Sequence, residues 1–150
     1  MAMTEHNPPE NSLADYVALE YILLGDLRDL LEEAKSDEET TRWIAAVLDA
    51  LLETLPAEME LKSQGGYLQP VLEQFPNWAG QIGDLASEKQ ILFEKLRELR
   101  VQLHHPASYE LLALEIRQDL QEWMTLWTAH LRHERRIMQS AFTLDVGCGD

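Results

Sequence analysis

Apolar side chains recur every three or four positions over four long stretches of the chain, the spacing that places them on one face of an α-helix. The third stretch is the clearest, and its inward positions are Ile82, Leu85, Lys89, Leu92, Leu96, Leu99 and Leu103. The inward positions of the fourth stretch are Tyr109, Leu112, Ile116, Leu120, Trp123, Trp127, His130, Glu134 and Met138. These patterns predict helices that bury one face each.

The first two stretches have the same periodicity. Ser12 is a residue type that caps helix N-termini, and the inward positions after it are Leu13, Tyr16, Glu20, Leu23, Leu27, Leu31 and Ala34. The second stretch carries Trp43, Val47, Leu48, Leu51, Leu55, Met59 and Lys62. Pro56 lies inside this second pattern and is expected to bend the helix.

Breaks between the stretches are short. Ser36 and Glu39 have the spacing of a capping box, Gly65-Gly66 ends the second helix, and His104-His105-Pro106 ends the third. Residues 67–78 are irregular but apolar, with a short helical turn expected from Pro70 to Gln74. Ser108 starts the last helix, which is expected to end near Phe142.

Short connections make neighbouring helices antiparallel, so the fold class is all-α: an up-down-up-down antiparallel four-helix bundle. We expect a flexible N-terminal arm over 1–11, the bundle over 12–142 and an extended C-terminal tail over 143–150.

Charge and cysteine content narrow the function classes. The 150 residues include 27 acidic and 12 basic side chains, a formal net charge of −15, which disfavours nucleic acid and anionic membranes as partners. The single cysteine, Cys148, fits a reducing compartment, and the polar first residues contain no apolar signal core, so we expect a cytoplasmic protein. A protein partner remains unidentified, and monomer and homodimer stay open.

Polar residues interrupt all four inward faces at about the same level. His130 and Glu134 lie one turn apart on the last helix, and Lys89 lies on the third. The second helix contributes Glu58 or Lys62, and the first contributes Glu20. One interpretation is a buried polar layer; the other is that long Lys and Glu side chains reach water at the bundle end.

These residues resemble the hemerythrin-like (HHE cation-binding) family over most of the chain. Residues 130–134 keep the His-x-x-x-Glu of the last helix of that family, and residues 88–92 resemble its Glu-His-x-x-Leu. Residues 58–62 take the place of its His-x-x-x-Glu, and residues 19–21 resemble its first Glu-His step. By this last analogy Tyr21, rather than Glu20, would belong to the cluster. The resemblance implies a non-haem di-iron centre used for oxygen or nitric oxide binding, iron handling or sensing.

Lysines occupy two of the family's ligand positions: Lys89 is found where the family has a histidine, and Lys62 where it has a glutamate. A charged ammonium has no lone pair and repels a cation, so we predict that the metal site has degenerated and that no cofactor is bound. In its place we expect a buried cluster in which Lys89 pairs with Glu134, and Lys62 with Glu20 or Glu58. The sequence thus predicts a non-catalytic interaction or regulatory module with no catalytic residues. The alternative is an iron-binding sensor or iron-handling domain with ligands His130, Glu134, Glu20 and Glu58.

Overall fold

The computed structural model describes residues 12–33, 38–64, 69–103 and 111–148. Every regular element in these ranges is a helix. The elements are α1 (Leu13–Glu32), α2 (Glu38–Gln64), α3 (Gln69–Gln74), the 3₁₀ helix η1 (Pro76–Trp78), α4 (Ala79–Gln102) and α5 (Leu111–Cys148). The predicted all-α class is confirmed. None of the described helices is long and apolar enough to cross a membrane.

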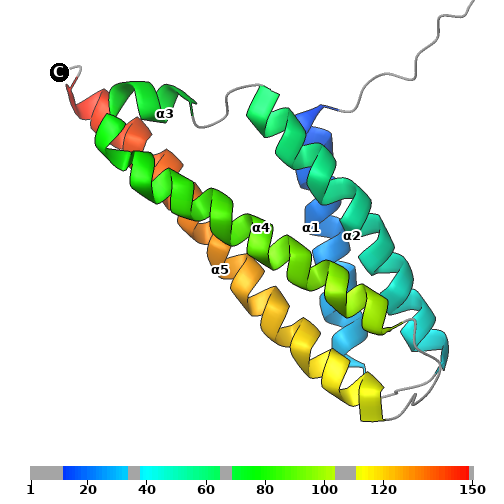
Figure 1. Ribbon diagram of the computed structural model, residues 1–150. Coiled ribbons are helices and arrows are strands. Elements are labelled where there is room, and N and C mark those ends of the chain that lie inside the picture. Colours follow the sequence, from blue (N-terminus) through cyan, green and yellow to red (C-terminus); the bar gives the residue numbers. More distant parts are fainter. Residues whose placement is uncertain (1–11, 34–37, 65–68, 104–110, 149–150) are drawn as a thin grey trace, which may run out of the picture.

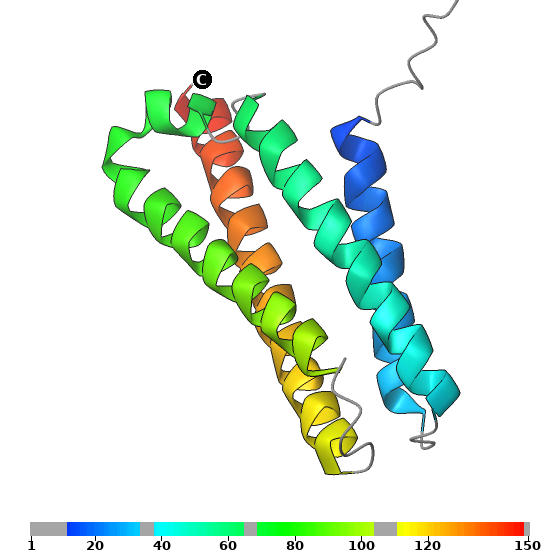
Figure 2. The ribbon, with the colours of Figure 1, turned by 45° about the vertical axis from the view of Figure 1, so that its right-hand side comes forward.

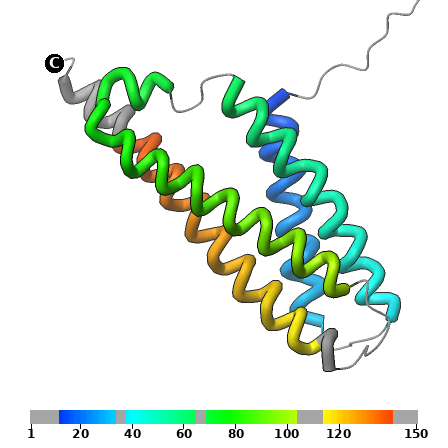
Figure 3. The backbone as a smooth tube through the Cα atoms, in the orientation of Figure 1, coloured from blue at the N-terminus to red at the C-terminus, as the bar shows by residue number. Residues whose placement is uncertain are grey.

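The four long helices pack as two pairs. Helix α1 lies beside α2, and α4 lies beside α5; the chain reverses its direction within each pair (Figure 1, Figure 2). The pairs meet where α2 contacts α4 and where α1 contacts α5. The short α3 and η1 lie at the end of the molecule where α4 begins and α5 finishes (Figure 1). Figure 3 shows α4 running beside α5. The inward faces of all four long helices therefore point to a shared interior.

The start of α1 shows how local sequence fixes a helix end. The Ser12 hydroxyl accepts a hydrogen bond from the Asp15 backbone N–H, and the Asp15 carboxylate accepts one from the Ser12 N–H, which completes a capping box. Near the other end of α1, Arg117 of α5 donates to the backbone carbonyls of Leu30 and Glu33. These carbonyls lack partners within the helix, so the contact ties α5 to α1.

The core follows the leucine stripes. Its buried members come from all four long helices and include Leu27, Leu31, Ile44, Leu48, Leu51, Leu55, Leu96, Leu99, Leu120, Trp123 and Trp127. The Trp123 Nε1–H donates to the Leu92 carbonyl at 2.7 Å, so this indole is buried without losing its hydrogen bond. One expected inward residue is wrong: the Trp43 side chain is 59% exposed, because the neighbouring Ile44 takes the core position.

A smaller apolar cluster closes the end at which α3 and η1 lie. Val71, Ile82, Leu85 and Ile137 form its buried part, and Phe75 stacks on Trp78 with ring centroids 5.0 Å apart. The predicted short helix over residues 70–74 is confirmed by α3. Ile82 and Leu85 of this cluster also line a pocket.

Helix α5 extends beyond the predicted end. The expected extended tail from Thr143 is wrong, because α5 continues to Cys148 and so includes most of 143–150. No proline or glycine occurs between Phe142 and Gly147, so nothing in the local sequence stops the helix. The arm over 1–11, the Ser36 cap, Gly65-Gly66 and residues His104 to Ser108 lie outside the described residues.

Candidate functional site: a buried charge cluster

The four long helices bring six polar side chains together in the interior. Glu20 comes from α1, Glu58 and Lys62 from α2, Lys89 from α4, and His130 and Glu134 from α5. The two carboxylates Glu20 and Glu58, together with His130 and Glu134, are buried, and His130 is only 1% exposed. The Lys62 and Lys89 side chains are each 13% exposed. We call these six residues the charge cluster.

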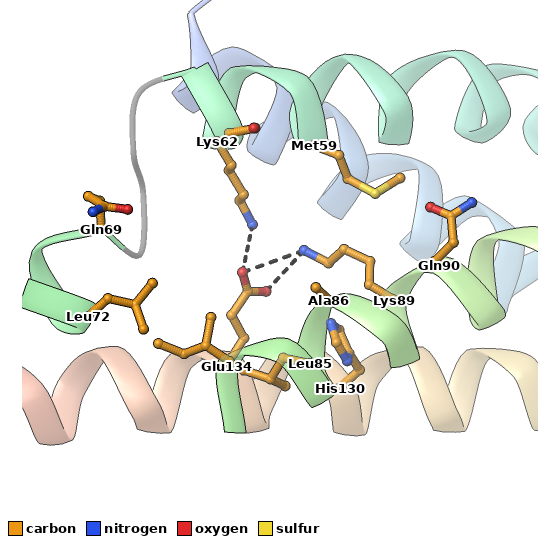
Figure 4. Close-up of a pocket in the computed structure, with 12 residues that line it drawn as sticks. Met59, Lys62, Gln69, Leu72, Leu85, Ala86, Lys89, Gln90, His130 and Glu134 are labelled. Atoms are coloured by element: carbon orange, nitrogen blue, oxygen red, sulfur yellow. Dashed lines mark hydrogen bonds and ion pairs between the residues drawn. The ribbon is translucent and has the colours of Figure 1, made fainter. Parts of the chain in front are cut away.

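Positive and negative groups alternate through the charge cluster. The Lys62 ammonium lies 3.2 Å from a Glu58 carboxylate oxygen and 3.3 Å from Glu134 Oε1. The Lys89 ammonium lies 3.2 Å from Glu134 Oε2 (Figure 4). The order of contacts is therefore Glu58, Lys62, Glu134, Lys89, with Glu134 held between two ammonium groups. The predicted Lys89–Glu134 pair is confirmed, and Lys62 pairs with Glu58 as one of the two expected alternatives.

Burial and neighbouring charges shift the pKa values of Glu134 and Lys89. Burial raises the pKa of the Glu134 carboxyl, but the charges of Lys89 and Lys62 and their hydrogen bonds outweigh it, so the pKa lies below its ordinary value. Burial lowers the pKa of Lys89 and the nearby Lys62 charge lowers it further, whereas Glu134 acts in the opposite direction. Glu134 is thus the anion on which both lysines depend.

Glu20 behaves differently from Glu134. Burial and the charge of Glu58 raise the pKa of Glu20 to about 8, and the two side chains share a hydrogen bond. A carboxyl with this pKa keeps its proton at neutral pH and can donate it to Glu58. With Glu20 neutral, the charges of Glu58 and Glu134 balance those of Lys62 and Lys89.

One functional contact was missed by the sequence analysis. A carboxylate oxygen of Glu88 on α4 lies 2.7 Å from His130 Nδ1. In the neutral imidazole this contact places the proton on Nδ1, which leaves Nε2 without a proton. The Glu88 side chain is 52% exposed and lies beside the inward stripe of α4, so apolar periodicity gave no signal for it.

The choice between Glu20 and Tyr21 is settled by exposure. Tyr21 is 78% exposed and does not belong to the charge cluster, so its inclusion was wrong. Successive helix residues differ in direction by about 100°, so Glu20 and Tyr21 cannot both face inward. The same geometry turns His133 to solvent while His130 is buried, as expected.

Four buried polar atoms in and around the charge cluster have no hydrogen-bond partner within the described part of the chain. They are Glu20 Oε2, Glu58 Oε2, Trp127 Nε1 and His130 Nε2. A buried polar group without a partner typically costs about 1–3 kcal/mol. Their side chains come from α1, α2 and α5, so the unmet hydrogen bonding belongs to the interior between the helices.

A pocket of about 420 Å³ opens beside the charge cluster. Lys62, Lys89, His130 and Glu134 line its polar side (Figure 4). Its apolar lining, which we call the apolar wall, consists of Met59, Leu72, Ile82, Leu85 and Ala86. The hydroxyl of Ser63 and the amides of Gln69 and Gln90 complete the lining. The pocket therefore offers both ionic and apolar contacts.

The charge cluster does not fit a di-iron centre. No group of three or more His, Cys, Asp or Glu side chains in the described ranges is arranged to hold a metal ion. Two ammonium groups lie within 3.3 Å of Glu134, where a cation bound to this carboxylate would meet their charge directly. Glu20 and Glu58 share a hydrogen bond with each other. A metal would have to displace both lysines and this shared proton.

Comparisons with known proteins assign no relative. No protein-family model, no curated protein and no solved structure matches the chain.

Proposed function

We propose that this protein is a hemerythrin-like, antiparallel four-helix bundle in which fixed charges have replaced the metal centre. It acts without catalysis, as an interaction or regulatory module. The observation that carries the proposal is the position of Glu134, whose two carboxylate oxygens contact the ammonium groups of Lys62 and Lys89. In this position the lysines supply the positive charge that a metal would supply to the same carboxylate.

Two further features support the proposal. The charge cluster draws residues from all four long helices, and those on α2, α4 and α5 stand at positions where the resemblance expects ligands. Its formal charges balance when Glu20 holds its proton, so the interior has no need of a cation. The family assignment itself rests on the residue pattern in 19–21, 58–62, 88–92 and 130–134.

One observation favours the alternative, a domain that binds non-haem iron for sensing or iron handling. The Glu88 carboxylate contacts His130 Nδ1, and histidines that bind metals commonly donate their second ring N–H to a carboxylate in this way. The alternative would use His130, Glu134, Glu20 and Glu58 as ligands. The two lysines make it the weaker proposal.

Restoring the family's residue types tests whether the lysines exclude metal. We expect wild-type protein to show no stoichiometric binding in an anaerobic Fe²⁺ titration, and the double variant Lys62→Glu/Lys89→His to gain it. The substitutions remove two cations and add two potential ligands. The matched control is Lys95→His, at an exposed position of α4, and we expect it to behave as wild type.

Stoichiometric Fe²⁺ binding by the wild type would overturn the proposal in favour of the iron-binding alternative. A folded double variant that binds no iron would show that the lysines are not what excludes the metal. Circular dichroism of both variants establishes that they are helical before the titration.

A further inference from the structure

The pocket beside the charge cluster has a net positive lining. Its charged members are the ammonium groups of Lys62 and Lys89 and the carboxylate of Glu134, so with His130 neutral the formal charge is two minus one, or +1. This differs in sign from the whole chain, whose net charge is −15. The Glu58 carboxylate lies just behind this lining, 3.2 Å from Lys62, and balances the excess, so the attraction for an anion is local to the ammonium groups that face the pocket.

The series of alternating ion pairs, Glu58, Lys62, Glu134 and Lys89, ends at the ammonium group of Lys89. Lys62 lies between Glu58 and Glu134, whereas the ion pairs of Lys89 within the described part of the chain are with Glu134 alone. An ammonium group has three N–H donors, and the two oxygens of Glu134 engage at most two of them. Lys89 therefore has capacity for one more anionic acceptor on the side of the pocket.

The apolar wall of the pocket favours a ligand that also has an apolar part. The apolar wall supplies five aliphatic or thioether side chains, and the pocket volume of about 420 Å³ is within the range of small-molecule sites. A fully hydrophilic anion would leave this wall without contacts, and a purely apolar molecule would leave Lys89 with Glu134 alone. A molecule with one anionic end and an apolar body satisfies both.

We propose that the pocket binds a small monocarboxylate with an apolar tail. The carboxylate pairs with Lys89 and extends the alternating order of charges by one more anion, while the tail lies against the apolar wall. This inference deepens the proposed function, on which it rests, because it gives the regulatory module a class of ligand. A carboxylate suits the site because its oxygens accept charge-assisted hydrogen bonds from an ammonium group such as that of Lys89.

Octanoate is the probe. We expect one equivalent to bind wild-type protein in calorimetry at physiological salt and to raise the melting temperature. Octanol tests the need for charge and octylammonium tests its sign; both are expected to bind at least about tenfold more weakly, a difference that corresponds to about 1.4 kcal/mol. Equal binding of octanol and octanoate would overturn the assigned role of Lys89.

Two variants locate the site. Ala86→Phe places a ring in the pocket from an exposed position of α4, so the fold is expected to persist while octanoate binding is lost. Its control is Ala129→Phe, at an exposed position of α5 that does not line the pocket, which should bind as wild type. Lys89→Met should weaken octanoate binding at least about tenfold, and Lys95→Met should leave it unchanged. Undiminished binding by Ala86→Phe would contradict the inference.

Octanoate binding and Fe²⁺ binding test the ligand class and the proposed function separately. If the wild type binds neither octanoate nor Fe²⁺, the proposed ligand class is wrong, while the proposal that lysines have replaced the metal still holds. Stoichiometric Fe²⁺ binding by the wild type would overturn the proposed function itself.

Discussion

Glu134→Gln is expected to lower the free energy of unfolding by about 3–5 kcal/mol, the range seen when one partner of a buried ion pair is removed. Glu134 is buried and its carboxylate contacts both Lys62 and Lys89, so the variant leaves two ammonium groups, each on a side chain only 13% exposed, without their common anion. Thermal or urea unfolding measures the effect, which corresponds to a fall in melting temperature on the order of ten degrees.

A second substitution separates the loss of the ion pair from a general packing defect. Adding Lys89→Met to Glu134→Gln is expected to recover part of the lost stability, because Lys62 still contacts Glu58 and no isolated ammonium remains at position 89. The control is Glu122→Gln, at an exposed position of the same helix, which should change stability by less than about 0.5 kcal/mol. An unchanged melting temperature for Glu134→Gln would show that the buried pairing does not exist.

Glu20→Gln is expected to remove a pH dependence of stability that the wild type has. The pKa of Glu20 is about 8 in the folded protein and near its ordinary value of 4.5 in the unfolded chain. The folded state therefore binds more protons between these values, and this contribution to stability is complete below pH 4.5 and is lost as the pH rises to about 8. Each unit of difference corresponds to about 1.4 kcal/mol, so the loss is on the order of a few kcal/mol.

The variant keeps a hydrogen-bond donor toward Glu58 but has no proton to lose. We expect Glu20→Gln to be more stable than wild type above about pH 8 and its unfolding free energy to vary less between about pH 5 and pH 8. Urea unfolding across this range measures both, with Glu53→Gln at an exposed position of α2 as the control. Parallel pH profiles for wild type and Glu20→Gln would show that Glu20 does not hold its proton.

Glu134 gives the free energy of unfolding the opposite pH dependence from Glu20. Its pKa lies below the ordinary value, so its contribution is present above pH 4.5 and is lost as the pH falls through the lowered pKa. The two carboxyl groups thus limit stability from opposite sides. Acid removes the anion that holds the lysines, and alkali removes the proton between Glu20 and Glu58.

The helices and most of the charge cluster could be predicted because both depend on periodicity. The leucine spacing in α4 has few competing interpretations, and it places Lys89 on the same face as Leu85 and Leu92. Glu20, His130 and Glu134 follow from the same rule, and the Lys89–Glu134 pair follows from charge once the helices are matched in level. The assignment of the four helices to the hemerythrin-like topology remains a proposal.

Periodicity along the sequence could not predict features that depend on contacts between different helices. Glu88 reaches His130 from the flank of α4, where an exposed carboxylate looks like any solvated residue. Lys62 contacts both Glu58 and Glu134, which requires the actual distance between α2 and α5. Trp43 was placed inward because it is apolar and lies four residues before Val47, but the register of α2 gives the core position to Ile44. The end of α5 was misplaced because the absence of a helix breaker counts for more than weak apolar spacing.

We propose that lysine ammonium groups take the place of a metal beside Glu134. The most direct test is the metal content and absorption spectrum of wild-type protein purified from iron-supplemented cells. We expect far less than one iron per chain and no absorption band of an oxo-bridged iron pair. Stoichiometric iron with such a band would contradict it.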